Sequence, residues 1–218
     1  MNKHLYVFKS DKRYDVTIRN YREKDFEHLI ELQRKAFPPP FPSDLLWNDE
    51  QLTAHITRFP EGALCIAVDG QIAGSITALR TNYANETHTW EQITSDGYIT
   101  DHEPDGKVIY IVDICIDPDY RGLGLGKELM RAMYETVVYL GAAKLAGGSR
   151  MPGFKEYKNE LTVEAYYEKV INGELSDPVV TFLMKAGRMP EKLMKNYLED
   201  EDSADCAVLM TWKNPFLA

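Results

Sequence analysis

The chain has 218 residues, a formal net charge of −9 at pH 7 and 44% hydrophobic residues, which suits a single globular domain over residues 1–218. The acidic charge argues against a nucleic-acid surface. The chain has no run of about 18 apolar residues and no apolar segment after Met1–His4, so we expect neither a membrane span nor a signal peptide.

Apolar periodicity and turn residues predict five elements in the first 80 residues. They are a strand at 15–19, a helix at 21–37, a helix at 44–59 and two strands at 63–68 and 71–80. Pro38–Pro40 ends the first helix, and Ser43 is placed to cap the second. Asp69-Gly70 between the two strands is a strong hairpin signal. One face of the first helix carries Phe26, Leu29, Ile30, Gln33 and Phe37.

Residues 82–106 form a long polar segment with Trp90 and Tyr98 embedded in it. Loops of this length are usually functional or disordered, so a lid or substrate wall and a mobile insertion both stay open. The segment also holds four side chains of metal-ligating types, but their spacing matches no metal template and we expect no metal site. These four are His88, Asp101, His102 and Glu103.

An apolar strand predicted at 108–116 is followed by the glycine-rich run Arg121–Gly126 and by a helix. Glycines bare the backbone N–H groups, and a helix N-terminus adds partial positive charge, so this junction favours a phosphate ligand. Lys127 adds a formal charge. The spacing G-x-G-x-G fits neither the dinucleotide fingerprint nor the P-loop of NTPases, which disfavours a nucleotide-binding oxidoreductase.

The last third predicts two helices and three strands in alternation with irregular segments. In order, these are a strand at 142–146, a loop at 147–153, a helix at 162–171, a helix from Asp177-Pro178 to Ala186, and strands at 188–197 and 205–212. Thr162 and Asp177 are placed as helix N-caps. We expect an α/β fold of the α+β kind, a mixed and mostly antiparallel sheet with helices on both faces, with insertions at about 82–106 and 150–176.

Two stretches, Val112–Pro118 and Arg121–Lys127, resemble the acyl-CoA-binding motif of the GNAT superfamily of N-acetyltransferases. The resemblance implies the GNAT fold, acetyl-CoA as co-substrate and direct attack by an amine. It also implies that backbone N–H groups of the strand hold the pantetheine and the acetyl carbonyl, and that the glycine loop holds the pyrophosphate. The residues implied are Ile114, Cys115 and Ile116 of the strand, with Arg121, Gly122, Leu123, Gly124, Gly126 and Lys127 of the loop.

Asp113 is the only acid inside the apolar part of this strand. A carboxylate is costly to bury without a partner, so Asp113 serves either as a general base at a polar cleft or as a structural hydrogen-bond acceptor. Cys115 raises the possibility of a covalent acyl-enzyme. No histidine lies near it in sequence, which favours a packed core thiol. The other cysteines, Cys65 and Cys206, also lie in apolar runs, as in a reduced cytoplasmic protein.

The family's second motif commonly supplies a tyrosine that protonates the leaving thiolate, and two stretches resemble it. Residues 165–169 look similar, but residues 181–188 lie at the expected position, which puts Leu183 where the tyrosine is usual. The alternatives for the acid are a water molecule or one of four tyrosines. These are Tyr157, Tyr166, Tyr167 and Tyr197.

The last seventy residues also resemble the acetyltransferase module found fused to nitrilase-type amidohydrolases, although Arg188 stands where an aromatic residue is more usual. This resemblance implies that Arg150 and Tyr157 line the acceptor side, while a salt-bridged Arg150 and a packed Tyr157 stay open as alternatives. With Asp113 from the strand before the glycine loop, Tyr157 completes the pair of candidate catalytic residues. We therefore expect an acyl-CoA-dependent N-acyltransferase that acts on a small-molecule or peptide amine, in the cytoplasm and possibly as a homodimer. The alternative is a non-catalytic CoA-binding regulatory or interaction module of the same fold.

Overall fold

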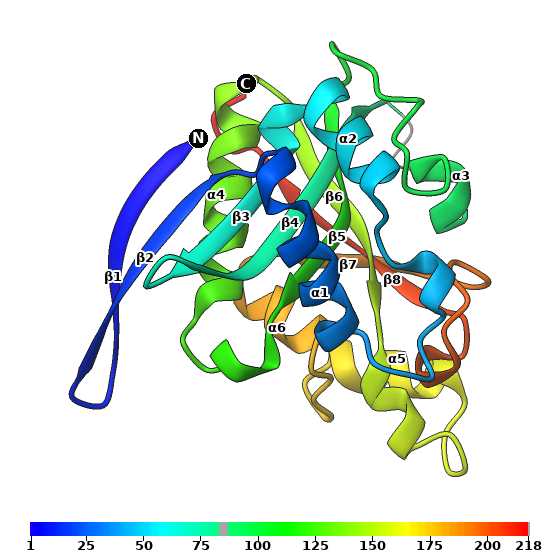
Figure 1. Ribbon diagram of the computed structural model, residues 1–218. Coiled ribbons are helices and arrows are strands. Elements are labelled where there is room, and N and C mark those ends of the chain that lie inside the picture. The colour runs from blue at the N-terminus through cyan, green and yellow to red at the C-terminus, as the bar shows by residue number, and fades with distance from the viewer. Residues whose placement is uncertain (83–86, 218) are drawn as a thin grey trace.

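The computed structural model describes residues 1–82 and 87–217, and in these residues the strands form one sheet (Figure 1). The strand order is β1-β2-β3-β4-β5-β6-β8-β7, and every neighbouring pair is antiparallel except β5–β6. The strands are β1 (Asn2–Lys9), β2 (Lys12–Asn20), β3 (Ala63–Val68), β4 (Gln71–Thr81), β5 (Val108–Ile116), β6 (Lys144–Arg150), β7 (Met189–Met194) and β8 (Ala207–Lys213).

Helices cover both faces of this sheet, which confirms the predicted architecture. Figure 1 shows α1 and α2 in front of the strands and α4 and α6 behind them. Among the described residues, no helix is both long enough and apolar enough to span a membrane. The helices are α1 (Phe26–Ala36), α2 (Asp49–Arg58), α3 (Trp90–Thr94), α4 (Leu125–Tyr139), α5 (Val163–Ile171) and α6 (Val180–Lys185). Short 3-10 turns lie at Glu23–Asp25, Ser43–Leu45, Pro60–Gly62, Pro118–Tyr120, Pro152–Glu156 and Glu201–Ser203.

The predicted hairpin is confirmed, because β3 and β4 meet at Asp69 (φ 49°) and Gly70 (φ 87°), two left-handed residues in succession. The predicted cap of α2 is wrong. Ser43 opens only a 3-10 turn, and the side chain of Asn48 accepts the cap hydrogen bond from the Gln51 N–H at 2.9 Å. Strand β1 was not predicted at all, because its polar residues hide the alternation of an edge strand.

The sheet continues through residues for which the sequence predicted a loop. Gly147 and Gly148 pair with Met210 and Leu209 of β8, so β6 runs to Arg150. These glycines serve close packing instead of a turn. A Cβ on Gly147 would lie 3.1 Å from the backbone oxygen of Ile111, and one on Gly148 would overlap the ring of Tyr197.

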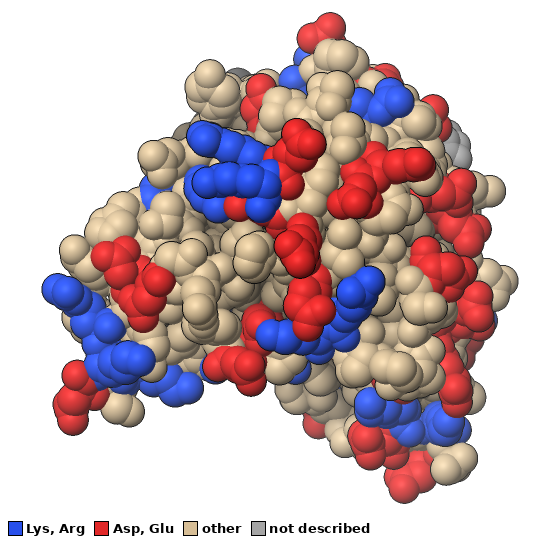
Figure 2. Space-filling view, viewed as in Figure 1, with Lys and Arg blue, Asp and Glu red and all other residues tan. Residues whose placement is uncertain are grey.

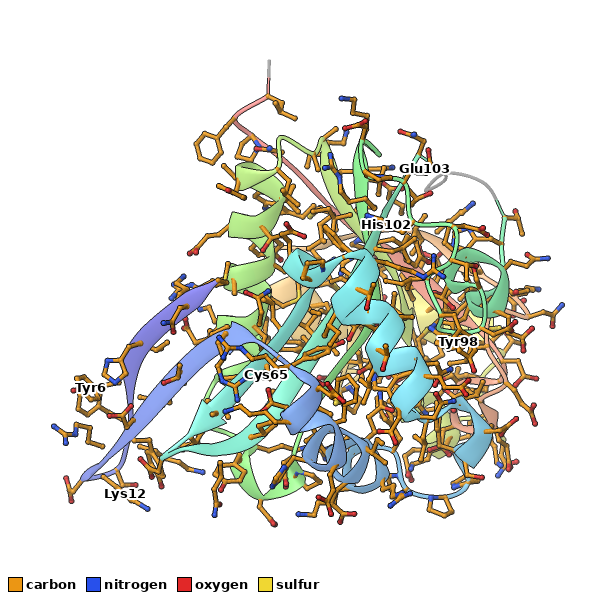
Figure 3. The ribbon with its side chains drawn as sticks, turned by 45° about the horizontal axis from the view of Figure 1, so that its top comes forward. Tyr6, Lys12, Cys65, Tyr98, His102 and Glu103 are labelled. Atoms are coloured by element: carbon orange, nitrogen blue, oxygen red, sulfur yellow. The ribbon has the colours of Figure 1, made fainter. Side chains whose placement is uncertain are left out.

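The described part of residues 82–106 contains the short helix α3 and is held against the rest of the molecule by side-chain contacts. Trp90 of α3 stacks on Trp47 with a centroid distance of 6.1 Å. The Nε2 of His55 lies 2.6 Å from the carbonyl oxygen of Gly97. Figure 3 shows His102 and Glu103 close together on this segment, where the His102 Nδ1 accepts the Arg80 N–H at 3.0 Å. The predicted insertion also includes residues 83–86, which lie outside the described residues.

Strands β5 and β6 diverge, and this divergence creates the site. Their parallel ladder joins Val108–Tyr110 to Lys144–Ala146. Beyond it, β5 stays paired with β4 as far as Ile116, while β6 stays paired with β8 as far as Arg150. A β-bulge at Thr77/Ala78 of β4 adds local twist at this point.

Candidate active site

A pocket fills the gap between the diverging strands. Its walls come from β5 and β6, from α1 and the segment after it, from α3, and from the region of α6 and β7. Acidic and basic side chains are mixed over the face shown in Figure 2, so that face has no single basic patch. The lining residues used below are Gln33, Phe41, Trp90, Asp113, Arg150, Leu183, Arg188 and Tyr197.

Asp113 lies in the pocket wall and is held by α1. The Nε2 of Gln33 donates a hydrogen bond to its carboxyl group at 3.2 Å, while the Oε1 of Gln33 accepts the Trp47 N–H at 2.6 Å. The second contact fixes the orientation of the amide. Burial raises the pKa of Asp113 to about 6, although the hydrogen bonds from Gln33 and Cys115 oppose the shift. The carboxyl group therefore titrates close to neutral pH, as a general base requires.

Cys115 is a buried thiol, as are Cys65 and Cys206. Its Sγ lies 3.4 Å from the hydroxyl of Ser75. Burial and the neighbouring Asp113 carboxylate raise the pKa of Cys115 well above its usual value, which keeps it protonated and a poor nucleophile. This environment supports the interpretation of Cys115 as a packed thiol.

Tyr197 is the candidate tyrosine that the structure brings to the pocket. Its hydroxyl is hydrogen-bonded to that of Tyr110 at 3.0 Å, and Tyr110 in turn lies 2.8 Å from the Nε2 of His88. The Trp90 N–H donates to the backbone oxygen of Tyr197 at 2.7 Å and holds the segment in place. Burial raises the pKa of Tyr197 to about 12, so it is a protonated donor at neutral pH.

Tyr157 and Tyr166 lie elsewhere. Tyr166 is buried and donates its hydroxyl to Asp177 at 3.0 Å. Tyr157 packs on the ring of Tyr166 at 5.4 Å and is not among the residues that line the pocket. This contact favours the alternative of a packed Tyr157, and its place on the acceptor side stays a prediction. The 3-10 turn at Pro152–Glu156 separates Tyr157 from β6, and the Tyr157 ring packs against α5 through Tyr166.

Arg150 lines the pocket and is paired. Its Nε and Nη2 donate to the buried carboxylate of Asp200 at 2.6 and 2.7 Å. Its guanidinium lies 4.6 Å from the ring centroid of Phe41, which sets Phe41 against the pocket wall.

Sequence reasoning missed three residues of the site. Trp90 donates its Nε1–H to the backbone oxygen of Val112 at 3.0 Å and so occupies part of the open edge of β5. Gln33 was visible as a polar residue on the apolar face of a helix, which is a signal of a buried hydrogen bond. Arg188 lines the pocket although it is only 2% exposed. Its departure from the usual aromatic residue was the only signal.

The glycine loop lies where β5 leads into α4. Gly122 (φ 81°) and Gly124 (φ 75°) are both left-handed, and no atom would lie within 4 Å of a Cβ on Gly124. The bare first turn of α4 is thus open to a ligand, with Arg121 and Lys127 exposed beside it. Leu123 is buried, and Gly126 packs against Phe182 of α6.

Comparison with known proteins gives one matching family model. The description "Acetyltransferase (GNAT) family" matches residues 26–147. The chain is 48% identical over 216 residues to "Uncharacterized N-acetyltransferase YkwB" of Bacillus subtilis, a match that covers 98% of this chain and 96% of that relative.

A longer relative and a solved structure are also similar. The chain is 36% identical over 202 residues to "Probable hydrolase YhcX" of Bacillus subtilis, which covers 91% of this chain but 39% of that protein. The loading GNATL domain of CurA from Lyngbya majuscula superposes with a TM-score of 0.78 at 22% identity, covering 91% of this chain and 98% of that domain. The predicted likeness to modules fused to nitrilase-type amidohydrolases stays a prediction.

Proposed function

Because the chain belongs to the GNAT acetyltransferase family, we propose that it transfers an acetyl group from acetyl-CoA to a primary amine by direct attack. The observation that carries the proposal is the Asp113 carboxyl group. It lines the pocket between the diverging ends of β5 and β6, where burial raises its pKa to about 6. The acceptor is a small molecule or a peptide amine.

The glycine loop is the proposed seat of the CoA pyrophosphate. The left-handed Gly122 and Gly124 free the N–H groups at the start of α4, and Arg121 and Lys127 supply positive charge beside them. The diverging end of β5, at Ile114, Cys115 and Ile116, is the proposed contact for the pantetheine and the acetyl carbonyl.

Asp113 is the proposed base. An amine with a pKa near 10 is almost fully protonated at neutral pH, so one proton must leave before the nitrogen can attack, and the Asp113 carboxylate accepts it directly or through water. At higher pH the free amine is abundant and this step matters less. Once the nitrogen bonds to the carbonyl carbon it becomes acidic and releases a second proton to solvent. The C–S bond then breaks and the electron pair leaves with the CoA sulfur.

Tyr197 is the proposed hydrogen-bond donor to the leaving thiolate. It replaces the tyrosine of the family's second motif, whose position Leu183 occupies in this chain. Because its pKa of about 12 is well above that of a thiol, Tyr197 stabilises the thiolate by a hydrogen bond and does not give up its proton. Its own position is fixed by Tyr110 and by the missing side chain of Gly148.

Two further expectations belong to this proposal. The buried free cysteines Cys65, Cys115 and Cys206 support a reducing cytoplasmic setting. A homodimer stays a prediction, and one candidate surface for it is the edge strand β1, where Tyr6 and Phe8 are 47% and 71% exposed. Figure 3 shows Tyr6 and Lys12 on this projecting hairpin.

The test is release of free thiol from acetyl-CoA with polyamines, amino acids, aminoglycosides and peptides. We expect Asp113→Asn to lower kcat at neutral pH far more than it raises the Kd of acetyl-CoA, with the loss shrinking as pH rises. Asp105→Asn, which removes an exposed carboxylate, is the matched control. Tight binding of acetyl-CoA without release by any amine would instead support the non-catalytic CoA-binding module.

A further inference from the structure

Arg188 is a buried arginine with an incomplete set of partners. It precedes β7, is 2% exposed and lines the pocket. Its Nη2 donates to the backbone oxygen of Met210, and its Nε has no hydrogen-bond partner in the part of the chain that the structure describes. The ionisable groups that act on it electrostatically are the hydroxyls of Tyr134, Tyr110 and Tyr197.

The guanidinium keeps its charge in this environment. Burial lowers the pKa of Arg188 to about 10, which still leaves it protonated at neutral pH. None of the ion pairs within residues 1–82 and 87–217 includes it. A buried charge without a counter-charge is strongly unfavourable, so such groups are normally paired.

Two other partly buried arginines of the chain are each paired with a carboxylate. Arg19 donates through Nη1 and Nη2 to both carboxylate oxygens of Asp25 at 2.6 and 2.9 Å. Arg150 makes the same two-pronged contact with Asp200. Arg188 is more deeply buried than either, yet no described carboxylate faces it, and the space beside it is the pocket.

We propose that Arg188 binds a carboxylate group of the substrate inside the pocket, in the place that Asp25 and Asp200 occupy at the other two arginines. A guanidinium matches a carboxylate in two parallel hydrogen bonds, and the buried Nε that lacks a partner is available for one of them. The inference rests on the proposed acyl transfer and narrows its substrates to those that carry a carboxylate.

The carboxylate can belong to either substrate. Asp113 lies toward α1, because Gln33 of α1 reaches it. Arg188 lies toward α4, because Tyr134 of α4 is its neighbour and donates to the adjacent Ala186 backbone oxygen at 2.9 Å. Ile114 of β5 and Arg188 line the same pocket, so an acyl chain of a donor held along β5 has access to Arg188. An amine attacking beside Asp113 shares the same pocket and has access as well.

The experiment compares carboxylates with neutral analogues of matched size in two arms. In the donor arm, succinyl-CoA is compared with butyryl-CoA. In the acceptor arm, acetyl-CoA is the donor and amino acids are compared with their amides. Binding is measured by calorimetry and transfer by thiol release, on the wild type, Arg188→Met and Arg188→Lys, with the exposed Arg58→Met as control.

In one arm, we expect the wild type to bind the carboxylate compound about 10- to 100-fold more tightly than its neutral analogue. Hydrogen bonds to a charged group contribute a free energy of this size. Arg188→Met should abolish the preference, Arg188→Lys should retain part of it, and Arg58→Met should keep it. No preference in either arm, or one that survives Arg188→Met, overturns the inference.

Two controls separate this inference from others. CoA should bind all variants equally, since the loop is intact. If CoA does not bind the wild type, the proposed function fails, whereas normal CoA binding and amine acetylation without carboxylate preference refute only the role of Arg188. The ligand-free Arg188→Met protein loses both an uncompensated charge and the hydrogen bond to Met210, and its Tm is measured to confirm that it is folded in the assay.

Discussion

The carboxyl group of Asp113 accepts a hydrogen bond from the side chain of Gln33, which lies 80 residues earlier in the chain, at 3.2 Å. This bond favours the ionised carboxylate and so lowers the pKa of Asp113, in opposition to burial. Helix α1 therefore contributes to the pKa of a carboxyl group on β5.

Replacing Gln33 by leucine should raise the pKa of Asp113 above its present value of about 6, because burial then acts without the opposing hydrogen bond. The acid limb of the kcat/KM profile should move to higher pH by the same amount. The profile is measured from pH 5 to 9, with Gln71→Leu on the surface of β4 as control. An unmoved acid limb in Gln33→Leu would separate Gln33 from the titration of the base.

The raised pKa of Asp113 also makes a prediction for stability. The folded state has a pKa of about 6 against the ordinary 3.8, so ionisation is costlier in the folded state. This destabilisation is absent below about pH 4, grows as pH rises and is complete above about pH 6. Asp113→Asn should therefore exceed the wild type in free energy of unfolding by about 1–2 kcal/mol at pH 7.5, once solvent screening in the pocket is allowed for, and by little at pH 4. Urea unfolding at both values tests it, and an equal difference at the two would contradict it.

Gly124→Val should weaken CoA binding by at least about tenfold, because a branched side chain then stands over the first turn of α4. The matched control is Gly141→Val at the other end of the same helix. Both glycines have positive φ (75° and 60°), and a Cβ at either would meet nothing within 4 Å. The two variants therefore carry a similar backbone strain, and only Gly124→Val should change the Kd in calorimetry. Equal Kd values in both would place the pyrophosphate elsewhere.

The pair Arg150–Asp200 should show unequal losses on mutation. Asp200 has a side chain that is 3% exposed and also accepts the Ser203 hydroxyl, whereas the Arg150 side chain is 20% exposed. Arg150→Met leaves a buried carboxylate unpaired and should cost about 3–5 kcal/mol in the free energy of unfolding. Asp200→Asn, which keeps an acceptor, should cost less. Chemical denaturation of both variants measures the difference in free energy of unfolding. Equal losses would show that the deeper burial of Asp200 does not determine the cost of breaking the pair.

The sequence predicted those elements well whose structure is determined by residues close together in the chain. Strand β5 lies at the predicted residues, since an unbroken apolar run ends at a turn sequence. Helix α5 begins at the predicted cap, where the Thr162 hydroxyl accepts the Ala165 N–H at 3.2 Å. Asp177 caps as predicted through the N–H groups of Val179 and Val180, although α6 begins slightly later.

The sequence failed where the cause lies far along the chain. Gly147 and Gly148 look like a turn, but their small size is required by Ile111 and Tyr197, which approach from other elements. The partner of Asp113 lies on another helix, and no local pattern joins the two. The unpaired state of Arg188 is likewise visible only after folding, because it depends on which carboxylates do not come near it.

The short ladder between β5 and β6 has a consequence for the motion of the molecule. It joins residues 108–110 to residues 144–146 and carries the continuity between two larger groups of strands, β1 to β5 and β6, β8 and β7. Because this ladder is short, local opening between the two groups of strands requires few broken hydrogen bonds. A molecule that fills the pocket contacts both groups and stabilises the pairing of β5 with β6. Amide hydrogen exchange at Val108–Tyr110 should therefore slow when the pocket is occupied, which would make this short stretch of backbone a reporter of occupancy for any ligand.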